Sequence, residues 1–215
     1  MAGVTETTME GGPPTRRGYA KGRAKREEIL QAAIVAFGEV GYHGASLREI
    51  AARVGISHPG LLHHFPTKAA LLEAVLEHRD AVDFADVDTD LQQGRTLFEA
   101  LVRLVQRNGL RRPVVEVFTG LAAEATSTDH PAHDYFARRY ASTVERVTAE
   151  LERLSGDGGL RDGVDPGAAA RAVTALMDGL QVQWLYSLER PRAARVDMAG
   201  DLRAYLDLIL VDPVG

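Results

Sequence analysis

The side chains best suited to chemistry in this 215-residue chain gather in one short segment near residue 60. Ser57, His58 and His63 place hydroxyl and imidazole groups along the start of a predicted helix, with Pro59 and Leu62 between them. Hydroxyl and imidazole groups donate and accept hydrogen bonds, and a helix N-terminus also binds anions through its free N–H groups. Such a surface suits phosphates and base edges better than it suits bond-making chemistry.

Metal and enzyme chemistry have little support in the residue types. The chain has no cysteine, which excludes disulfides, thiolate metal sites and a cysteine nucleophile. A metal site on His58, His63, His64 and His78 is not expected, because no acid lies three or four residues after His58 or His63, and the neighbours His63 and His64 do not share a helix face. Gly-rich phosphate loops, nucleophile elbows and informatively paired carboxylates are missing as well. We therefore expect no enzyme, no metal and no cofactor.

Three short predicted helices must position the segment near residue 60. An apolar stripe at helical spacing begins near Lys25 and ends at Gly41. Ser46 is expected to cap a second helix with Glu49 in a capping box, and Gly55 ends that helix. Ser57 is expected to cap the third helix, which Pro66 terminates, and Thr67 to cap a fourth helix reaching about Arg79.

The turn between the second and third helices has the residues of a helix-turn-helix. Ala51 is small enough for two steeply crossing helices to touch, and Gly55 permits the sharp bend. Ile56 and Leu61 then fill the angle between the helices. In this motif the start of the second helix, here the third predicted helix, enters the major groove of DNA.

Charge is distributed unevenly along the chain. Residues 15–68 hold nine Lys and Arg side chains against four Asp and Glu side chains, although the whole chain has a net charge of −5. A basic N-terminal part and an acidic C-terminal part suggest two functions in one chain. Residues 1–22 are predicted to be a flexible basic arm, which either enters the minor groove or keeps the chain in solution.

The remaining sequence is also helical in pattern, with an acidic, turn-like stretch predicted at residues 85–94. Helices are predicted near 95–107 and 113–126, followed by two long helices that end near 156 and 190 and a last helix that ends near 210. We predict an all-α fold of about nine helices. Its expected parts are the arm (1–22), a helix-turn-helix DNA-binding domain (23–83, motif 46–65) and a ligand-binding and dimerisation domain (84–215).

Residues 24–76 resemble the DNA-binding domain of the tetracycline-repressor (TetR) family of bacterial transcriptional regulators. The resemblance rests on Ala33, Phe37, Gly41, Ser46, Ile50–Ala51, Gly55–Ile56–Ser57, Leu61, His64–Phe65, Lys68 and Leu71–Leu72. It implies a homodimer in which each N-terminal head reads one DNA half-site. The family often has Tyr and Thr where this chain has Leu62 and Gly60, and Gly or a polar residue where it has Pro59.

Carried over residue by residue, the resemblance implies roles for eight side chains in DNA binding. Ser46 and Lys68 would hold phosphates, and the helix His58–His63 would read bases. The full expected set is Ser46, Arg48, Ser57, His58, Pro59, Leu62, His63 and Lys68. Ser46 and Ser57 serve equally as helix caps, and Lys68 as an ordinary surface charge.

The C-terminal part is expected to bind an unknown small-molecule effector and a second copy of the chain. Ligand contacts are assigned from residue type and location alone, to Phe98, Phe118, Glu124, His133, Tyr140 and Trp184. The last two long helices are expected to pair across a two-fold axis through Leu176, Leu180, Trp184, Leu206 and Ile209.

These features together favour a ligand-responsive DNA-binding transcriptional regulator. The expected form is a homodimeric repressor that a small-molecule effector releases from a palindromic operator on double-stranded DNA. The alternative is a helical small-molecule-binding or catalytic module with a vestigial or protein-binding helix-turn-helix. A cytoplasmic protein without a membrane partner is expected, because neither a transmembrane run nor a signal-peptide core appears.

Overall fold

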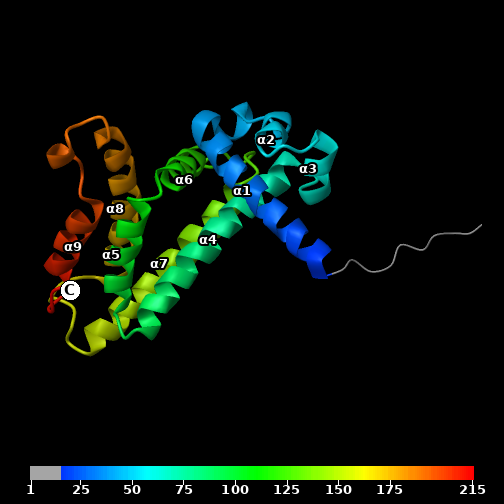
Figure 1. Cartoon of the computed structure of the whole chain (residues 1–215). Coiled ribbons are helices and arrows are strands. Elements are labelled where there is room, and N and C mark those ends of the chain that lie inside the picture. Colours follow the sequence, from blue (N-terminus) through cyan, green and yellow to red (C-terminus); the bar gives the residue numbers. More distant parts are fainter. Residues whose placement is uncertain (1–15) are drawn as a thin grey trace, which may run out of the picture.

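A computed structural model describes residues 16–215, and this part of the chain is all-α (Figure 1). It has nine α-helices and no strand, which confirms the predicted fold class. The helices are α1 (Arg16–Gly44), α2 (Leu47–Arg53), α3 (His58–His64), α4 (Lys68–Gln92), α5 (Leu97–Asn108), α6 (Arg112–Glu124), α7 (His133–Gly156), α8 (Pro166–Ser187) and α9 (Met198–Ile209), with a short 3-10 helix at Arg192–Ala194. Within the same residues, no helix is long and apolar enough to cross a membrane.

Helix α1 is longer than the sequence pattern predicts. It begins at Arg16, so the last seven residues of the predicted flexible arm are helical, and residues 1–15 lie outside the described residues. The Ala, Lys and Arg residues that follow Arg16 are good helix formers, so the helix extends upstream of its apolar stripe. Gly41 interrupts α1 at φ 70° and ψ 177°, where the first apolar stripe was predicted to end.

The helix-turn-helix forms as predicted at its turn. Gly55 has φ 66°, its N–H donates to Ala52 O at 3.1 Å, and Ile56 N–H donates to Ala51 O at 3.0 Å. This pair of bonds is the Schellman motif, which closes the C-terminus of α2 and turns the chain. Ala51 and Leu61 are fully buried where the two helices meet.

Two of the three predicted N-caps near this motif form. Ser57 Oγ accepts from Gly60 N at 3.2 Å, and Thr67 Oγ1 accepts from Ala70 N at 3.0 Å. Ser46 makes no side-chain cap bond, so the capping box predicted with Glu49 is wrong. Ser46 holds the extended backbone of an N-cap, but its hydroxyl does not reach the α2 backbone.

Helix α4 continues past its predicted end at Arg79 to Gln92, and the turn predicted at residues 85–94 is wrong. Its acids fall on one face at spacings of three and four residues, opposite a row of arginines that begins in α5. The pairs are Asp83–Arg111 at 2.9 Å, Asp86–Arg107 at 3.1 Å and Asp90–Arg103 at 2.8 Å. Ion pairing between helices therefore keeps an acidic segment helical.

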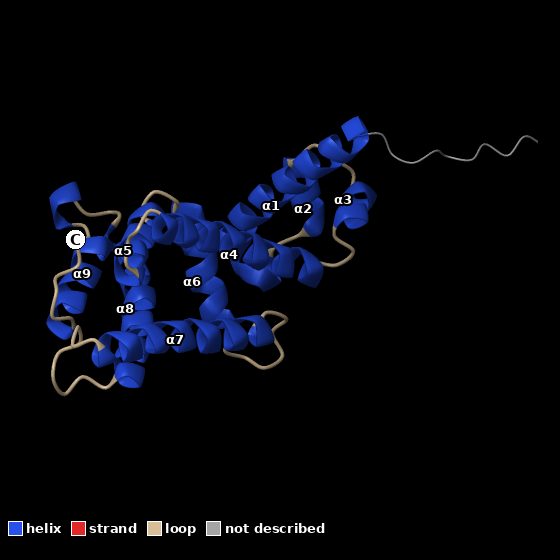
Figure 2. Cartoon of the chain, turned by 90° about the horizontal axis from the view of Figure 1, so that it is seen from below, coloured by secondary structure: helices blue, strands red, loops and turns tan. Residues whose placement is uncertain are grey.

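The apolar side chains form two clusters, and Figure 2 shows α1, α2 and α3 on one side of the molecule and α5, α8 and α9 on the other. One joins α1–α3 and the first half of α4 with α6 and the start of α7, through Phe118, Leu121 and Phe136. The other joins α5, α7, α8 and α9. Figure 1 shows α2 and α3 at one end, α9 and the C-terminus at the other, and α4 running between them. Helix α4 also passes through the domain boundary predicted at residues 83/84.

Candidate nucleic-acid interface and internal cavity

Helix α3 lies on the surface with its predicted contact residues outward. Ser57, Pro59 and His63 are exposed, and His58 and Leu62 are half-buried. Leu61 is completely buried on the opposite face of the helix and anchors it to the head. The helix is therefore held firmly while its outer side remains accessible to a partner.

Two further predicted contacts flank α3. Arg48 is exposed on α2, and Ser46 is half-buried at the start of that helix with its hydroxyl unbound to the helix backbone. Nearby, Arg53 is paired with Glu39 at 2.6 Å, which offsets part of the local positive charge. Among the described residues, Arg48 forms no ion pair with another side chain of this chain, so its guanidinium is available to a partner.

Lys68 has a structural role that the sequence does not indicate. Its ammonium donates to the carbonyl oxygens of Ala45 at 2.9 Å and His43 at 3.2 Å, and lies 4.6 Å from the ring centroid of Tyr42. These contacts tie the start of α4 to the end of α1. A phosphate contact of Lys68 stays a prediction.

Basic residues near the start of α1 also have structural contacts. The Arg26 guanidinium lies 4.9 Å from the Phe65 ring centroid, and Lys25 Nζ lies 3.5 Å from Val54 O. Lys25 pairs in addition with Glu28. These contacts hold α1 against the helix-turn-helix, a role that the count of positive charges alone did not reveal.

Glu124 and His130 form a junction between the head and the rest of the molecule. Glu124 Oε2 accepts from Tyr42 N at 3.1 Å and lies 3.6 Å from His130 Nε2. The Tyr42 and His130 rings pack edge to face, with their centroids 5.1 Å apart. Burial, the largest effect, lowers the pKa of His130, and His43 adds to it while Glu124 opposes it.

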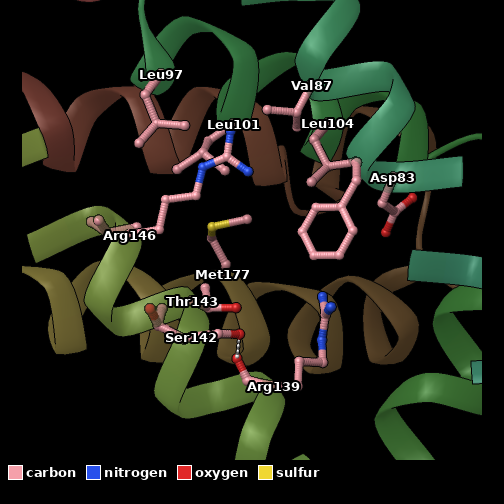
Figure 3. Close-up of a pocket in the computed structure, with 13 residues that line it drawn as sticks. Asp83, Val87, Leu97, Leu101, Leu104, Arg139, Ser142, Thr143, Arg146 and Met177 are labelled. Atoms are coloured by element: carbon pink, nitrogen blue, oxygen red, sulfur yellow. Dashed lines mark hydrogen bonds between the residues drawn. The ribbon is translucent and has the colours of Figure 1, made fainter. Parts of the chain in front are cut away.

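A partly open cavity of about 290 Å³ lies between α4, α5, α7 and α8 (Figure 3). Its apolar wall is formed by Phe84, Val87, Leu97, Leu101, Leu104, Val147 and Met177. Its polar groups are Asp83, Arg139, Ser142, Thr143, Arg146 and Thr174. An apolar chamber with a few polar groups is typical of small-molecule sites. We call it the outer chamber.

A second space of about 50 Å³ shares Leu104, Arg139, Thr143, Thr174 and Met177 with the outer chamber and is more polar. We call it the inner chamber. Its remaining lining includes Arg79, Asn108, Phe118, Tyr140, Asp178 and Gln181. Tyr140 donates to Asp178 Oδ2 at 2.7 Å, and burial raises the pKa of both groups.

Two family models match this chain, one over its N-terminal part and one over its C-terminal part, and both describe regulatory proteins. A family model described as "Bacterial regulatory proteins, tetR family" matches residues 29–75. A model described as "BetI-type transcriptional repressor, C-terminal" matches residues 93–211, more than half of the chain. The chain belongs to the TetR family of bacterial transcriptional regulators. Members of this family are generally not enzymes.

Individual TetR-family relatives resemble the head in sequence and the whole chain in structure. The regulator RutR of Escherichia coli K12 is 47% identical over 53 residues, 25% of each chain. The regulator BetI of Yersinia pestis is 39% identical over 54 residues, 25% of this chain and 27% of BetI. These alignments span about a quarter of the relatives' length. A Saccharomonospora viridis regulator solved with choline is 26% identical, with a TM-score of 0.73, over 88% of this chain and 100% of that one.

The six residues assigned to the effector of this TetR-family chain lie in different places. None lines the outer chamber; Phe118 and Tyr140 line the inner chamber. Glu124 belongs to the head junction, and His133 Nδ1 lies 2.9 Å from Ala125 O beside it. Phe98 and Trp184 are buried in the second apolar cluster. The two chambers are lined by residues of five helices, α4 to α8, which residue type alone cannot bring together.

The predicted dimer residues need a correction. Leu180, Trp184, Leu206 and Ile209 are buried within the single chain, because α8 and α9 pack on each other and on α5 and α7. Leu176 is half-buried against the same cluster. The expectation that a partner must cover these side chains is therefore wrong. The exposed apolar residues on this part of the TetR-family chain are Val182, Tyr186, Leu208 and Val211.

Proposed function

We propose that this TetR-family chain is a ligand-responsive DNA-binding transcriptional regulator, in the form of a homodimeric repressor that a small molecule releases from a palindromic operator. The observation that carries the proposal is the exposed outer side of α3, with Ser57 and His63 accessible and Leu61 buried beneath. The excess of positive charge in residues 15–68 supplies the salt-dependent part of DNA affinity. Such a regulator acts in the cytoplasm, where bacterial DNA is found.

The homodimer is proposed through α8 and α9. Gly179, Val182 and Tyr186 share one face of α8, and Tyr186 is 81% exposed. Leu208 on α9 is 71% exposed. A two-fold pairing of these helices would cover the apolar side chains and set two α3 helices against half-sites about 34–36 Å apart.

Release by an effector is proposed to act through α4. One end of this helix packs in the head core through Leu71 and Leu72, while Asp83 and Val87 line the outer chamber. A ligand that fits the chamber better in one position of α4 favours that position of the head. By linkage, an effector that weakens operator binding is itself bound more weakly by the DNA complex.

DNA binding is tested by titrating the protein into two DNA fragments at several salt concentrations. One fragment is the region upstream of its own gene, and the other is an unrelated fragment of equal length. We expect the upstream fragment to bind at least a thousandfold more tightly. The double variant His58→Ala/His63→Ala should lose most of this preference with its fold intact, whereas Arg138→Ala, an exposed change on α7, should keep it. Equal affinity for both fragments would contradict the proposal and favour a module that binds small molecules alone.

A further inference from the structure

The inner chamber contains a buried cation whose hydrogen bonds are incomplete. The side chain of Arg79 is 8% exposed, and its Nη1 has no hydrogen-bond partner. Its Nε lies 3.0 Å from Asp83 Oδ2 without the alignment of a hydrogen bond. Because a buried guanidinium without acceptors is costly, this side of the chamber has spare capacity for an acceptor.

Three carboxylates lie nearby, and most of their oxygens are engaged. Asp83 Oδ1 accepts from Arg111 at 2.9 Å, and Asp178 Oδ2 accepts from Tyr140 at 2.7 Å. Asp80 accepts from Tyr135 and pairs with Arg139. Asp83 Oδ2 has no hydrogen-bond partner, but Asp83 lines the outer chamber and not the inner one. Among the residues that line the inner chamber, the buried side-chain atoms without a partner are therefore the donors of Arg79, which favours a negatively charged or strongly accepting ligand group.

The aromatic surface is likewise occupied by the chain's own cations. The guanidinium carbon of Arg79 lies 3.6 Å from the Phe118 ring centroid, and that of Arg139 lies 5.0 Å from it. A quaternary ammonium ligand needs such a ring face for itself and would lie beside two guanidinium groups. A cation is thus disfavoured here, although the solved S. viridis relative is a choline complex.

We propose that the effector is an organic carboxylate with a flexible apolar body, its carboxylate in the inner chamber at Arg79 and Arg139 and its body in the outer chamber. This inference rests on the proposed function, in which these chambers form the effector site. The outer chamber of about 290 Å³ is several times larger than the inner one and has room for the apolar body. The inner chamber of about 50 Å³ suits a carboxylate alone.

Three probes with the same eight-carbon chain test the sign of the head group: octanoate, octanol and octyltrimethylammonium. Calorimetric titration of the full chain should give saturable binding of octanoate, at least tenfold tighter than octanol, and none of the cation. Tighter binding of the cation, equal binding of all three or binding of none would overturn the proposal.

Three variants locate the carboxylate. Arg139→Gln should reduce the preference for octanoate over octanol to within about threefold while octanol affinity is kept. Arg138→Gln, one residue away on the exposed side of α7, should keep the preference, and Arg146→Gln tests whether the carboxylate lies instead at the partly exposed wall of the outer chamber. If Arg146→Gln removes it and Arg139→Gln does not, the proposed position of the head is wrong. Melting by circular dichroism checks that each variant is folded.

The same samples separate this inference from the proposed function. Operator affinity is measured with and without saturating octanoate. Octanoate that binds but leaves operator affinity unchanged supports the ligand class and contradicts its role as an effector. Sequence-specific DNA binding with no octanoate binding contradicts the ligand class and leaves the regulatory function standing.

Discussion

Gly41 is the residue at which the first helix changes direction toward the rest of the molecule. Its φ of 70° and ψ of 177° lie in a region that is essentially restricted to glycine. A Cβ at this position would overlap Glu124 Oε1, whose carboxylate also accepts from Tyr42 N. Two separate constraints, one of backbone and one of space, therefore apply to the same residue.

Gly41→Ala should lower the free energy of unfolding by about 1–3 kcal/mol from backbone strain alone, with a further loss as Glu124 is displaced. Denaturant titration measures the change. Gly94→Ala is the matched control, because Gly94 also has a positive φ, of 82°, but has open space around its Cβ position. Equal losses in the two variants would show that the contact with Glu124 contributes nothing.

His130 should make stability depend on pH. Burial lowers the pKa of this ring, with a further lowering from His43 and opposition from Glu124, and Nδ1 already accepts from Ala132 N at 3.2 Å. Below a pH of about 6.5, the pKa of an unperturbed histidine, the His130 ring is protonated in the unfolded chain but stays neutral in the folded chain. The stability contributed by neutral His130 is thus complete above about pH 6.5 and is lost as the pH falls.

The comparison of the chain with His130→Gln isolates this effect. At pH 5.5 the part of the acid loss due to His130 should amount to at most about 1.4 kcal/mol, the value for one proton. Urea titrations at pH 7.5 and 5.5 measure it for both proteins. His63→Gln, at an exposed position, should leave the loss unchanged; the prediction fails if His130→Gln does so too.

At the scale of elements, α4 shows where sequence patterns are sufficient and where they are not. The helix-turn-helix could be predicted because a glycine turn and a small crossing residue are local signals, whereas the DNA contacts of its residues stay predictions. The second half of α4 could not, since its acids are stabilised by arginines of α5 and beyond rather than by an apolar stripe. Of the inner chamber, only Phe118 and Tyr140 were assigned to a ligand from the sequence, and Arg79, Arg139 and Asp178 were missed because they come from three different helices.

Asp90 is the acid on which this helix pairing most depends. Burial opposes its ionisation, but hydrogen bonds from Arg107 and Arg103 outweigh burial and lower the pKa of Asp90. Asp90→Asn should lower the free energy of unfolding by about 2–3 kcal/mol near neutral pH, less than for a fully buried pair because the arginines are partly exposed.

The loss of stability from Asp90→Asn should shrink as the pH falls below about 4. The pKa of Asp90 is lower in the folded chain than in the unfolded chain, so the ionised carboxylate contributes stability at neutral pH, and protonation removes that contribution in acid. Thermal melts at pH 7 and 3.5 measure it. Asp88→Asn is the control, because Asp88 is exposed and lies 3.7 Å from Arg146; its effect should stay within about 0.5 kcal/mol. Equal effects would mean that the buried network adds no stability.

At the scale of the whole molecule, the surfaces proposed for DNA and for a second copy of the chain lie at opposite ends. Helix α3 lies at one end, and α8 and α9, which carry the exposed residues Tyr186 and Leu208, lie near the other (Figure 1). Between them α4 spans the head core and the outer chamber. An effector therefore acts on the distance between two heads only if the far ends are joined in a dimer.

The double change Tyr186→Arg/Leu208→Arg should accordingly separate the subunits while each keeps its fold, because both side chains project from the surface and neither contributes to the buried clusters. Loss of the second head should weaken operator binding by about a hundredfold or more, since one head no longer raises the effective concentration of the other. Sedimentation velocity and DNA titration measure the two effects. Leu110→Arg changes a residue that is 88% exposed on the link between α5 and α6, so it should leave both the dimer and the DNA affinity unchanged. A variant that remains dimeric would move the interface away from α8 and α9, and a monomer with undiminished affinity would mean that a single head carries the whole interaction.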